Sequence, residues 1–245
     1  MFLPLALLLA RISAFFAVLP IFSWRAVPAR IRVGMALLVT VFFATITPRP
    51  AVADGPVAAM TAVVLIVCEV LCGLSLGLAA GLVYRSVQVG ARFAGRQMGF
   101  AIASIVDPAT GEQSQPLAMV FETSFMMFFL AAEGHHLLLM AVSGSFEAFP
   151  TGTTPETAYL VGAVIRAGSA MLLFAMKLAA PILAAMLILS VILAVLSRIL
   201  PEMNILLMSF PLRVGLGLFV AAAMMPLLHS FAVELADWMS RFLVS

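Results

Sequence analysis

Long apolar runs dominate this chain, and short polar segments separate them. The apolar runs cover residues 2–23, 33–47, 57–83, 117–149, 158–199 and 203–228. A helix needs about 20 apolar residues to cross the hydrocarbon core of a bilayer. Most of these runs are long enough, so the pattern predicts a series of membrane-spanning helices.

Two of the runs are too long for one simple span. We expect the fourth run to break near Glu133 and the fifth run to form a helical hairpin broken near Pro181, because a charge and a proline interrupt them there. The last segment, residues 229–244, mixes apolar positions with charged ones and predicts an amphipathic C-terminal helix. The predicted fold class is an all-α polytopic membrane protein of helical hairpins, with one domain over residues 1–245.

Composition agrees with a membrane protein. The chain is 64% hydrophobic and 10% charged, whereas a soluble domain has about 25% charged residues. Its net charge of +2 lacks the basic patch that a nucleic-acid partner requires, so we expect none. Cys68 and Cys72 lie four residues apart in an apolar run, which is neither a redox CxxC pair nor a complete zinc site.

Ionisable residues fall inside or at the edges of the apolar runs. Among them are Glu69, Glu122, Lys177 and Arg213. Charges are costly in lipid and usually face a protein interior or a water-filled path. We therefore expect this chain to have protein neighbours around parts of its helices.

Small residues recur at a spacing of four in two separate stretches of the chain, the first over residues 73–81 and the second over residues 91–99. The set consists of Gly73, Gly77, Gly81, Ala91, Gly95 and Gly99. This spacing lets two membrane helices approach closely. The glycines predict helix packing, and the spacing leaves open whether the facing helix belongs to this chain or to a partner.

The segment 99–116 is unusually polar for its place between two apolar runs. Asp107-Pro108 and Gly111 disfavour a continuous helix. At membrane depth, irregular backbone is tolerated only where protein or a water-filled cavity surrounds it. An ordinary surface loop is the alternative interpretation.

No catalytic, metal or cofactor site is predicted. His135 and His136 are adjacent and point about 100° apart on a helix, so they chelate poorly. Ser143 and Ser145 lack a nucleophile elbow and a third partner that would support a serine protease. We expect a protein that is not an enzyme and binds no cofactor.

An ordered set of short motifs runs along the chain. The first part of the set comprises Pro20, Val27-Pro28, Arg30-Ile31-Arg32, Glu69 with Gly73 and Gly77, Gly95 to Phe100, Asp107-Pro108 and Gly134-His135. The second part comprises Ser145-Phe146, Pro150, Gly152, Ala180-Pro181, Leu196-Ser197-Arg198, Pro201, Asn204, Phe210-Pro211-Leu212, Gly217 and Met225-Pro226. This ordered set resembles the FliR family of flagellar export-gate proteins, and the match extends over nearly the whole chain. Glu202 departs from the pattern, because the family usually has glutamine there.

The resemblance implies a non-enzymatic subunit of a type III protein export gate. Such a subunit assembles with FliP and FliQ in the bacterial inner membrane at the flagellar basal body, with FlhB docked on the gate and unfolded flagellar proteins in transit. It also implies that the loop 102–116 plugs the closed channel. The plug residues would be Ile102, Ile105, Asp107, Pro108, Gly111 and Pro116. Ile102 is a departure from this pattern, because the resemblance implies an aromatic residue at the channel constriction.

Two alternatives come with this interpretation. The first is the related injectisome subunit of the SctT group, although the early and closing motifs resemble the flagellar proteins more. The second is a small-molecule transporter, which would require broken helices at corresponding positions of two repeated halves. Pro181 and the segment 99–116 are not related by any evident repeat.

Overall fold

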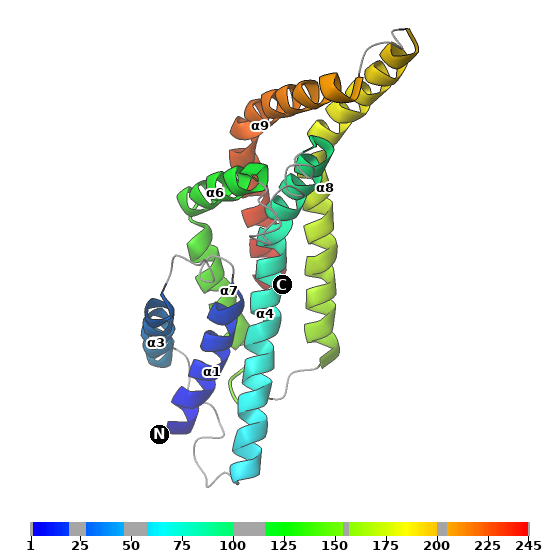
Figure 1. Ribbon diagram of the computed structural model, residues 1–245. Helices are drawn as coiled ribbons and strands as arrows, with labels where there is room; N and C mark the ends of the chain where they lie inside the picture. Colours follow the sequence, from blue (N-terminus) through cyan, green and yellow to red (C-terminus); the bar gives the residue numbers. More distant parts are fainter. Residues whose placement is uncertain are drawn as a thin grey trace. The chain divides into compact units, whose positions relative to one another are not determined.

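The computed structural model describes residues 2–19, 28–46, 58–99, 116–153, 157–199 and 205–244 (Figure 1). The helices are α1 (Phe2–Val18), α3 (Ala29–Ile46), α4 (Ala59–Gln97), α6 (Pro116–Ala131), α7 (Gly134–Ala148), α8 (Thr157–Ile199) and α9 (Ile205–Val244). No strand occurs in these ranges. The all-α prediction is confirmed.

Several helices are long and apolar enough to cross a membrane. Four segments qualify singly: Ala29–Ile46, Ala59–Gln97, Thr157–Ile199 and Ser209–Leu235. The α6 and α7 helices qualify only as a bent pair, which is either one broken span or a re-entrant loop. The chain is therefore a polytopic membrane protein, as the apolar runs predicted.

The predicted break near Glu133 is present. Glu133 has a left-handed backbone with φ of 57°, which is uncommon for a residue with a side chain. It lies between the end of α6 at Ala131 and the start of α7 at Gly134. A left-handed residue cannot continue a right-handed helix, so the apolar run is divided there.

The predicted break near Pro181 is wrong. Helix α8 continues through Pro181, and α9 likewise contains Pro211 and Pro226. A proline inside a helix costs about 3 kcal/mol. Ending the helix in apolar surroundings would leave several backbone groups without partners, each at a cost of several kcal/mol. The continuous helix is therefore the less costly choice, and α8 is not a hairpin.

Two further boundaries differ from the apolar runs. Helix α4 continues past residue 83 to Gln97, through three arginines that ended the predicted span. Residues 229–244, expected as a helix of their own, form the last part of α9. Hydropathy marks where a chain stops being apolar, whereas backbone hydrogen bonding decides where a helix ends.

The chain divides into two compact units. Unit 1 consists of Met1–Tyr84, Glu133–Ala170 and Leu235–Ser245, and unit 2 of Arg85–Ala132 and Met171–Glu234. Helices α4, α8 and α9 contribute residues to both. That residues 1–245 form a single domain stays a prediction.

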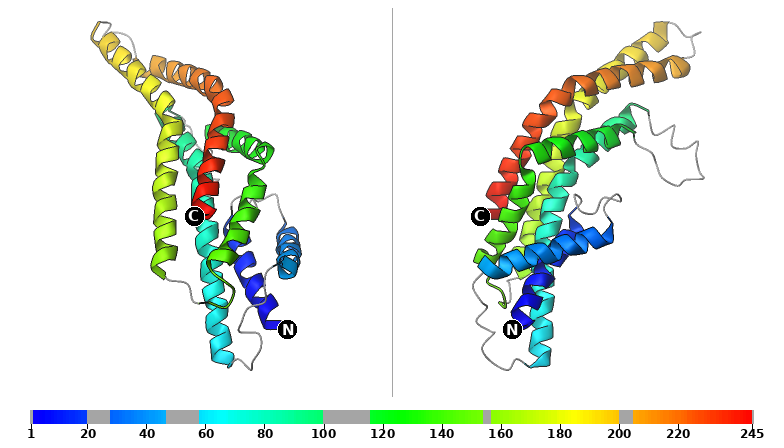
Figure 2. Two further views of the ribbon diagram at one scale, coloured as in Figure 1. Left: turned by 180° about the vertical axis from the view of Figure 1, so that it is seen from behind. Right: turned by 90° about the vertical axis from the view of Figure 1, so that its left-hand side faces the viewer.

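In unit 1, α1 lies against the first part of α4 (Figures 1 and 2). Two glycines of α4 make this contact possible. A Cβ atom at Gly73 would lie 2.2 Å from the carbonyl oxygen of Arg11, and one at Gly77 would lie 2.9 Å from that of Phe15. The neighbour of these two glycines is thus a helix of the same chain. Gly81 is also buried.

Unit 2 has its own close helix contact and aromatic core. A Cβ atom at Gly90 of α4 would lie 2.6 Å from the carbonyl oxygen of Ala175 of α8. The ring of Phe231 packs against Phe125 and Phe174, with centroids 6.3 and 5.7 Å away. Rings at these distances pack edge to face, an arrangement that stabilises aromatic pairs. Gly90 did not belong to the predicted glycine set.

The other two glycines of that set also lie in unit 2. Gly95 is buried. Gly99 has a φ of 90°, and an added Cβ atom would lie 3.4 Å from the ring of Phe210. A positive φ favours glycine because it has no side chain to clash with the backbone. Gly99 therefore meets a requirement of backbone conformation in addition to its place in the helix spacing.

We predict that alanine substitutions rank by the space available at each glycine. Gly73→Ala should destabilise more than Gly77→Ala, because the added Cβ atom would lie 2.2 Å from a backbone oxygen at Gly73 and 2.9 Å from one at Gly77. Gly77→Leu should be worse than Gly77→Ala. Gly168→Ala is the control, since no neighbouring atom lies within 4 Å, and alanine favours a helix by about 1 kcal/mol over glycine. Thermal unfolding of the detergent-purified protein measures the order; a Gly73→Ala protein as stable as Gly168→Ala would contradict it.

Candidate functional site

Two opposite charges meet in the core of unit 1. Arg11 of α1 is 2% exposed and Glu69 of α4 is 1% exposed, and Arg11 Nε lies 2.5 Å from Glu69 Oε2. Both residues occur within apolar segments of their helices. Neither charge would be tolerated there alone, because burying an unpaired charge is very costly.

Arg11 also binds the C-terminal end of α7. Its Nη1 donates to the carbonyl oxygens of Ser145 and Phe149, each at 2.9 Å. The last carbonyl groups of a helix have no partner within the helix, and the helix dipole makes this end negative. The guanidinium group therefore supplies both a positive charge and hydrogen-bond donors. It also lies 4.7 Å from the ring centroid of Phe146, within range of a cation–π interaction.

The second oxygen of Glu69 binds the turn that follows α7. Its Oε1 accepts a hydrogen bond of 2.9 Å from the backbone N–H of Gly152. Gly152 has a φ of 86°, in the left-handed region that glycine adopts without strain. The hydroxyl of Thr153 donates to the carbonyl of Pro150 and closes the turn. Both carboxylate oxygens of Glu69 thus have partners.

This network, the Arg11–Glu69 centre, joins α1, α4, the end of α7 and the following turn. A buried ion pair stabilises a protein only when its geometry is good and its remaining donors and acceptors are satisfied. Here the carboxylate is fully bonded and the guanidinium is bonded through two nitrogens. We therefore interpret the centre as a structural connection among three helices.

The surroundings of the centre do not support catalysis by Ser145. Its hydroxyl donates to the carbonyl oxygen of Val142 at 2.7 Å, so its proton is directed to the backbone. His135 and His136 are exposed and stack on each other, with centroids 4.8 Å apart. The described residues contain no group of three or more side chains suited to hold a metal ion.

Unit 2 contains Glu122, Lys177 and Arg213, three ionisable residues that the sequence analysis singled out, and each has a partner. Gln88 Nε2 donates to Glu122 Oε2 at 3.1 Å. Lys177 Nζ lies 2.5 Å from Glu234 Oε1, and Arg213 Nη2 donates to the hydroxyl of Ser190 at 3.2 Å. The partner of each charge is thus a residue of this same chain.

Most of the predicted plug lies outside the described residues. This is so for Ile102, Ile105, Asp107, Pro108 and Gly111. Pro116 is the first residue of α6. Proline suits this position, because the first residues of a helix have no acceptor for their N–H groups. The plug assignment stays a prediction.

The sequence as a whole matches a known protein family. The family model described as "Bacterial export proteins, family 1" matches residues 2–239. The chain belongs to this family.

Relatives agree with that assignment over most of their length. The flagellar biosynthetic protein FliR of Escherichia coli K12 is 33% identical over 93% of this chain and 86% of its own. FliR of Bacillus subtilis is 32% identical over 86% of this chain and 82% of its own. The Yop proteins translocation protein T of Yersinia pestis is 27% identical over 86% of this chain and 81% of its own. This chain is therefore similar to both flagellar and Yop export proteins.

For this member of the export-protein family, sequence reasoning singled out Glu69 but missed its partner. Arg11 looked like a mere interruption of the first apolar run. One signal could have found the pair: Arg11 and Glu69 are single opposite charges deep within two separate apolar runs. Such charges in membrane helices usually pair with each other.

We predict that removing one member of the pair is far worse than removing both. Glu69→Leu leaves Arg11 buried without a counter-charge and should cost roughly 3–5 kcal/mol. The double variant Arg11→Met/Glu69→Leu should recover part of this loss, because no buried charge remains. Unfolding in denaturant of the detergent-purified protein measures the difference.

Glu147→Leu serves as the matched control, because Glu147 is an exposed carboxylate on α7. It should stay close to wild type. A Glu69→Leu protein as stable as the Glu147→Leu protein would show that the Arg11–Glu69 centre does not stabilise the fold.

Proposed function

We propose that this chain, a FliR-type subunit of a type III protein export gate, works with FliP and FliQ as its partners and with FlhB docked on the gate. Near end-to-end similarity to FliR proteins is the observation that carries the flagellar assignment. Exported flagellar proteins would pass unfolded through the channel that these subunits surround. The role is non-enzymatic, and the site of action is the inner membrane at the flagellar basal body.

The surface of α8 supports an assembled state. Large apolar side chains are exposed along its second half: Leu187, Ile188, Val191, Ile192, Val195 and Ile199. Exposed apolar patches of this kind require lipid or another protein as their neighbour. A subunit within a helical gate would cover them with partner helices.

The injectisome subunit remains the second candidate. Only the similarity to the Yersinia protein favours it. The identity to that protein is 27%, which is lower than the 33% and 32% identity to the two FliR proteins named above. The two roles differ in the substrates exported. Restoring motility to a bacterium that lacks its own FliR would therefore distinguish them.

We predict that its partners stabilise this chain. Expressed alone with a tag, it should be less stable in mild detergent than in its complex, because detergent does not replace the packing of partner helices on its exposed apolar faces. Co-expression with FliP and FliQ should yield a monodisperse complex that contains all three proteins. Size-exclusion chromatography with mass spectrometry of the peak checks this outcome. A monodisperse monomer that retains neither partner would contradict the proposed function.

We also predict that the loop 102–116 closes the resting channel. Removing Thr110 to Ser114 should leave the complex assembled but make it conduct ions, because less chain would cross the channel. A matched variant replaces the same five residues by glycine and serine and keeps the loop length. Conductance of the purified complex in planar bilayers measures closure. Near-zero conductance of an intact complex with the deletion would return the segment to an ordinary surface loop.

A further inference from the structure

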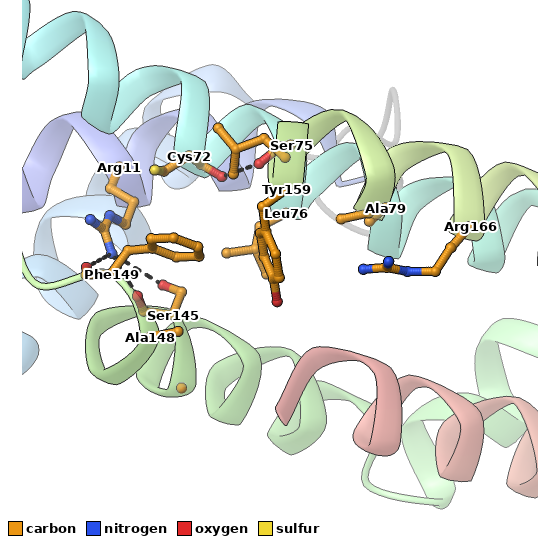
Figure 3. Close-up of a pocket in the computed structure, with 13 residues that line it drawn as sticks. Arg11, Cys72, Ser75, Leu76, Ala79, Ser145, Ala148, Phe149, Tyr159 and Arg166 are labelled. Atoms are coloured by element: carbon orange, nitrogen blue, oxygen red, sulfur yellow. Dashed lines mark hydrogen bonds between the residues drawn. The ribbon is translucent and has the colours of Figure 1, made fainter. Parts of the chain in front are cut away.

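Unit 1 has a hollow beside the Arg11–Glu69 centre, which we call the basic hollow (Figure 3). Helices α4, α7 and α8 supply most of its lining. The lining includes Arg11, Ser75, Ser145, Phe149, Tyr159 and Arg166. Of its two arginines, Arg11 is ion-paired with Glu69, so the positive charge that the hollow presents to a ligand is that of Arg166. The hollow therefore favours an anionic group.

The polar groups of the basic hollow differ in the protons they offer. The hydroxyl of Ser75 already donates to the carbonyl of Cys72, and that of Ser145 to Val142. The hydroxyl of Tyr159 makes no hydrogen bond to any residue in the described ranges. Arg166 has five N–H donors, so it can bind an anion while keeping another contact. Tyr159 and Arg166 are thus the donors best placed for a ligand.

An apolar groove adjoins the basic hollow. We define the apolar groove by Leu71, Leu74, Ser75 and Leu78 of α4 with Thr157, Leu160, Val161, Val164 and Ile165 of α8. It shares Ser75 and Leu160 with the basic hollow. Its volume of about 360 Å³ lies within the range of ligand sites. An elongated ligand can therefore place a polar end in one and an apolar end in the other.

We propose that this combined site binds one anionic phospholipid. Its phosphate would accept hydrogen bonds from Tyr159 and Arg166, and one acyl chain would lie in the apolar groove. Arginine matches a phosphate in geometry as well as charge. Basic pockets between membrane helices bind anionic lipid headgroups.

The position of the site along α8 supports a lipid over other occupants. Tyr159 and Arg166 lie in the first turns of α8, shortly after the polar turn 150–153. Tyrosine is enriched at the level of lipid headgroups. A partner helix would fill the groove without an anion for Arg166, and free phosphate would leave the groove empty. The phospholipid uses both parts.

The test is native mass spectrometry of the full-length protein, purified alone and in its complex. Phosphatidylglycerol and phosphatidylethanolamine are added separately in detergent. The wild-type protein should bind phosphatidylglycerol more tightly than phosphatidylethanolamine. The affinity of the double variant Tyr159→Phe/Arg166→Gln for phosphatidylglycerol should be about tenfold lower than that of the wild type, equivalent to about 1.4 kcal/mol. Inorganic phosphate at equal concentration should displace no lipid, because it does not occupy the groove.

Two control variants on the same helix isolate the site. Arg198→Gln removes an exposed arginine near the other end of α8, and Val195→Trp enlarges an exposed valine there. Both should bind lipid like the wild type, whereas Val164→Trp, which fills the groove, should not. Equal binding by wild type and Tyr159→Phe/Arg166→Gln would overturn the proposal. So would loss of complex assembly in Val164→Trp together with a lipid-free wild-type complex, since the groove would then be a partner interface.

Discussion

The buried contact between Arg11 and Glu69 is the constraint on which the arrangement of unit 1 depends. Each charge requires the other, because an unpaired charge in this core would cost roughly 3–5 kcal/mol, a large share of the stability of an ordinary protein. The pair fixes where α1 lies along α4. Arg11 then reaches the end of α7, and Glu69 reaches the N–H of Gly152. One ion pair thus determines the place of three helices and a turn.

The close approach of α1 and α4 follows from the same constraint. Gly73 lies one helical turn from Glu69, and its missing side chain lets the backbone of Arg11 come near. A larger residue there would push the two helices apart and lengthen the ion pair. The small-residue pattern and the charge pair therefore serve one contact, in which packing and electrostatics depend on each other.

The apolar surroundings also explain why long helices persist through residues that end helices in water. Pro181, Pro211 and Pro226 lie inside helices. In lipid or among other helices no water is available to bind released backbone groups. Helix α8 also exposes apolar side chains, and such a surface requires lipid or another protein as its neighbour. A subunit of an export gate has such neighbours.

Much of this protein follows from its sequence alone. Its apolar runs are long enough to identify a helical membrane protein, since a span must satisfy its own backbone hydrogen bonds. The left-handed break at Glu133 was also predictable, as a charge inside an apolar run. The ordered motifs indicated the export family, which the comparison with known proteins confirmed over residues 2–239.

Tertiary structure decided what local pattern could not. The continuity of α8 through Pro181 depends on what surrounds the helix, and a sequence window does not contain that information. Whether Gly73 faces its own chain or another depended on which helix packs there. Arg11 and Glu69 are 58 residues apart, and nothing local joins them. Their pairing is set by the free energy of the folded core, where a charge must find its counter-charge across helices.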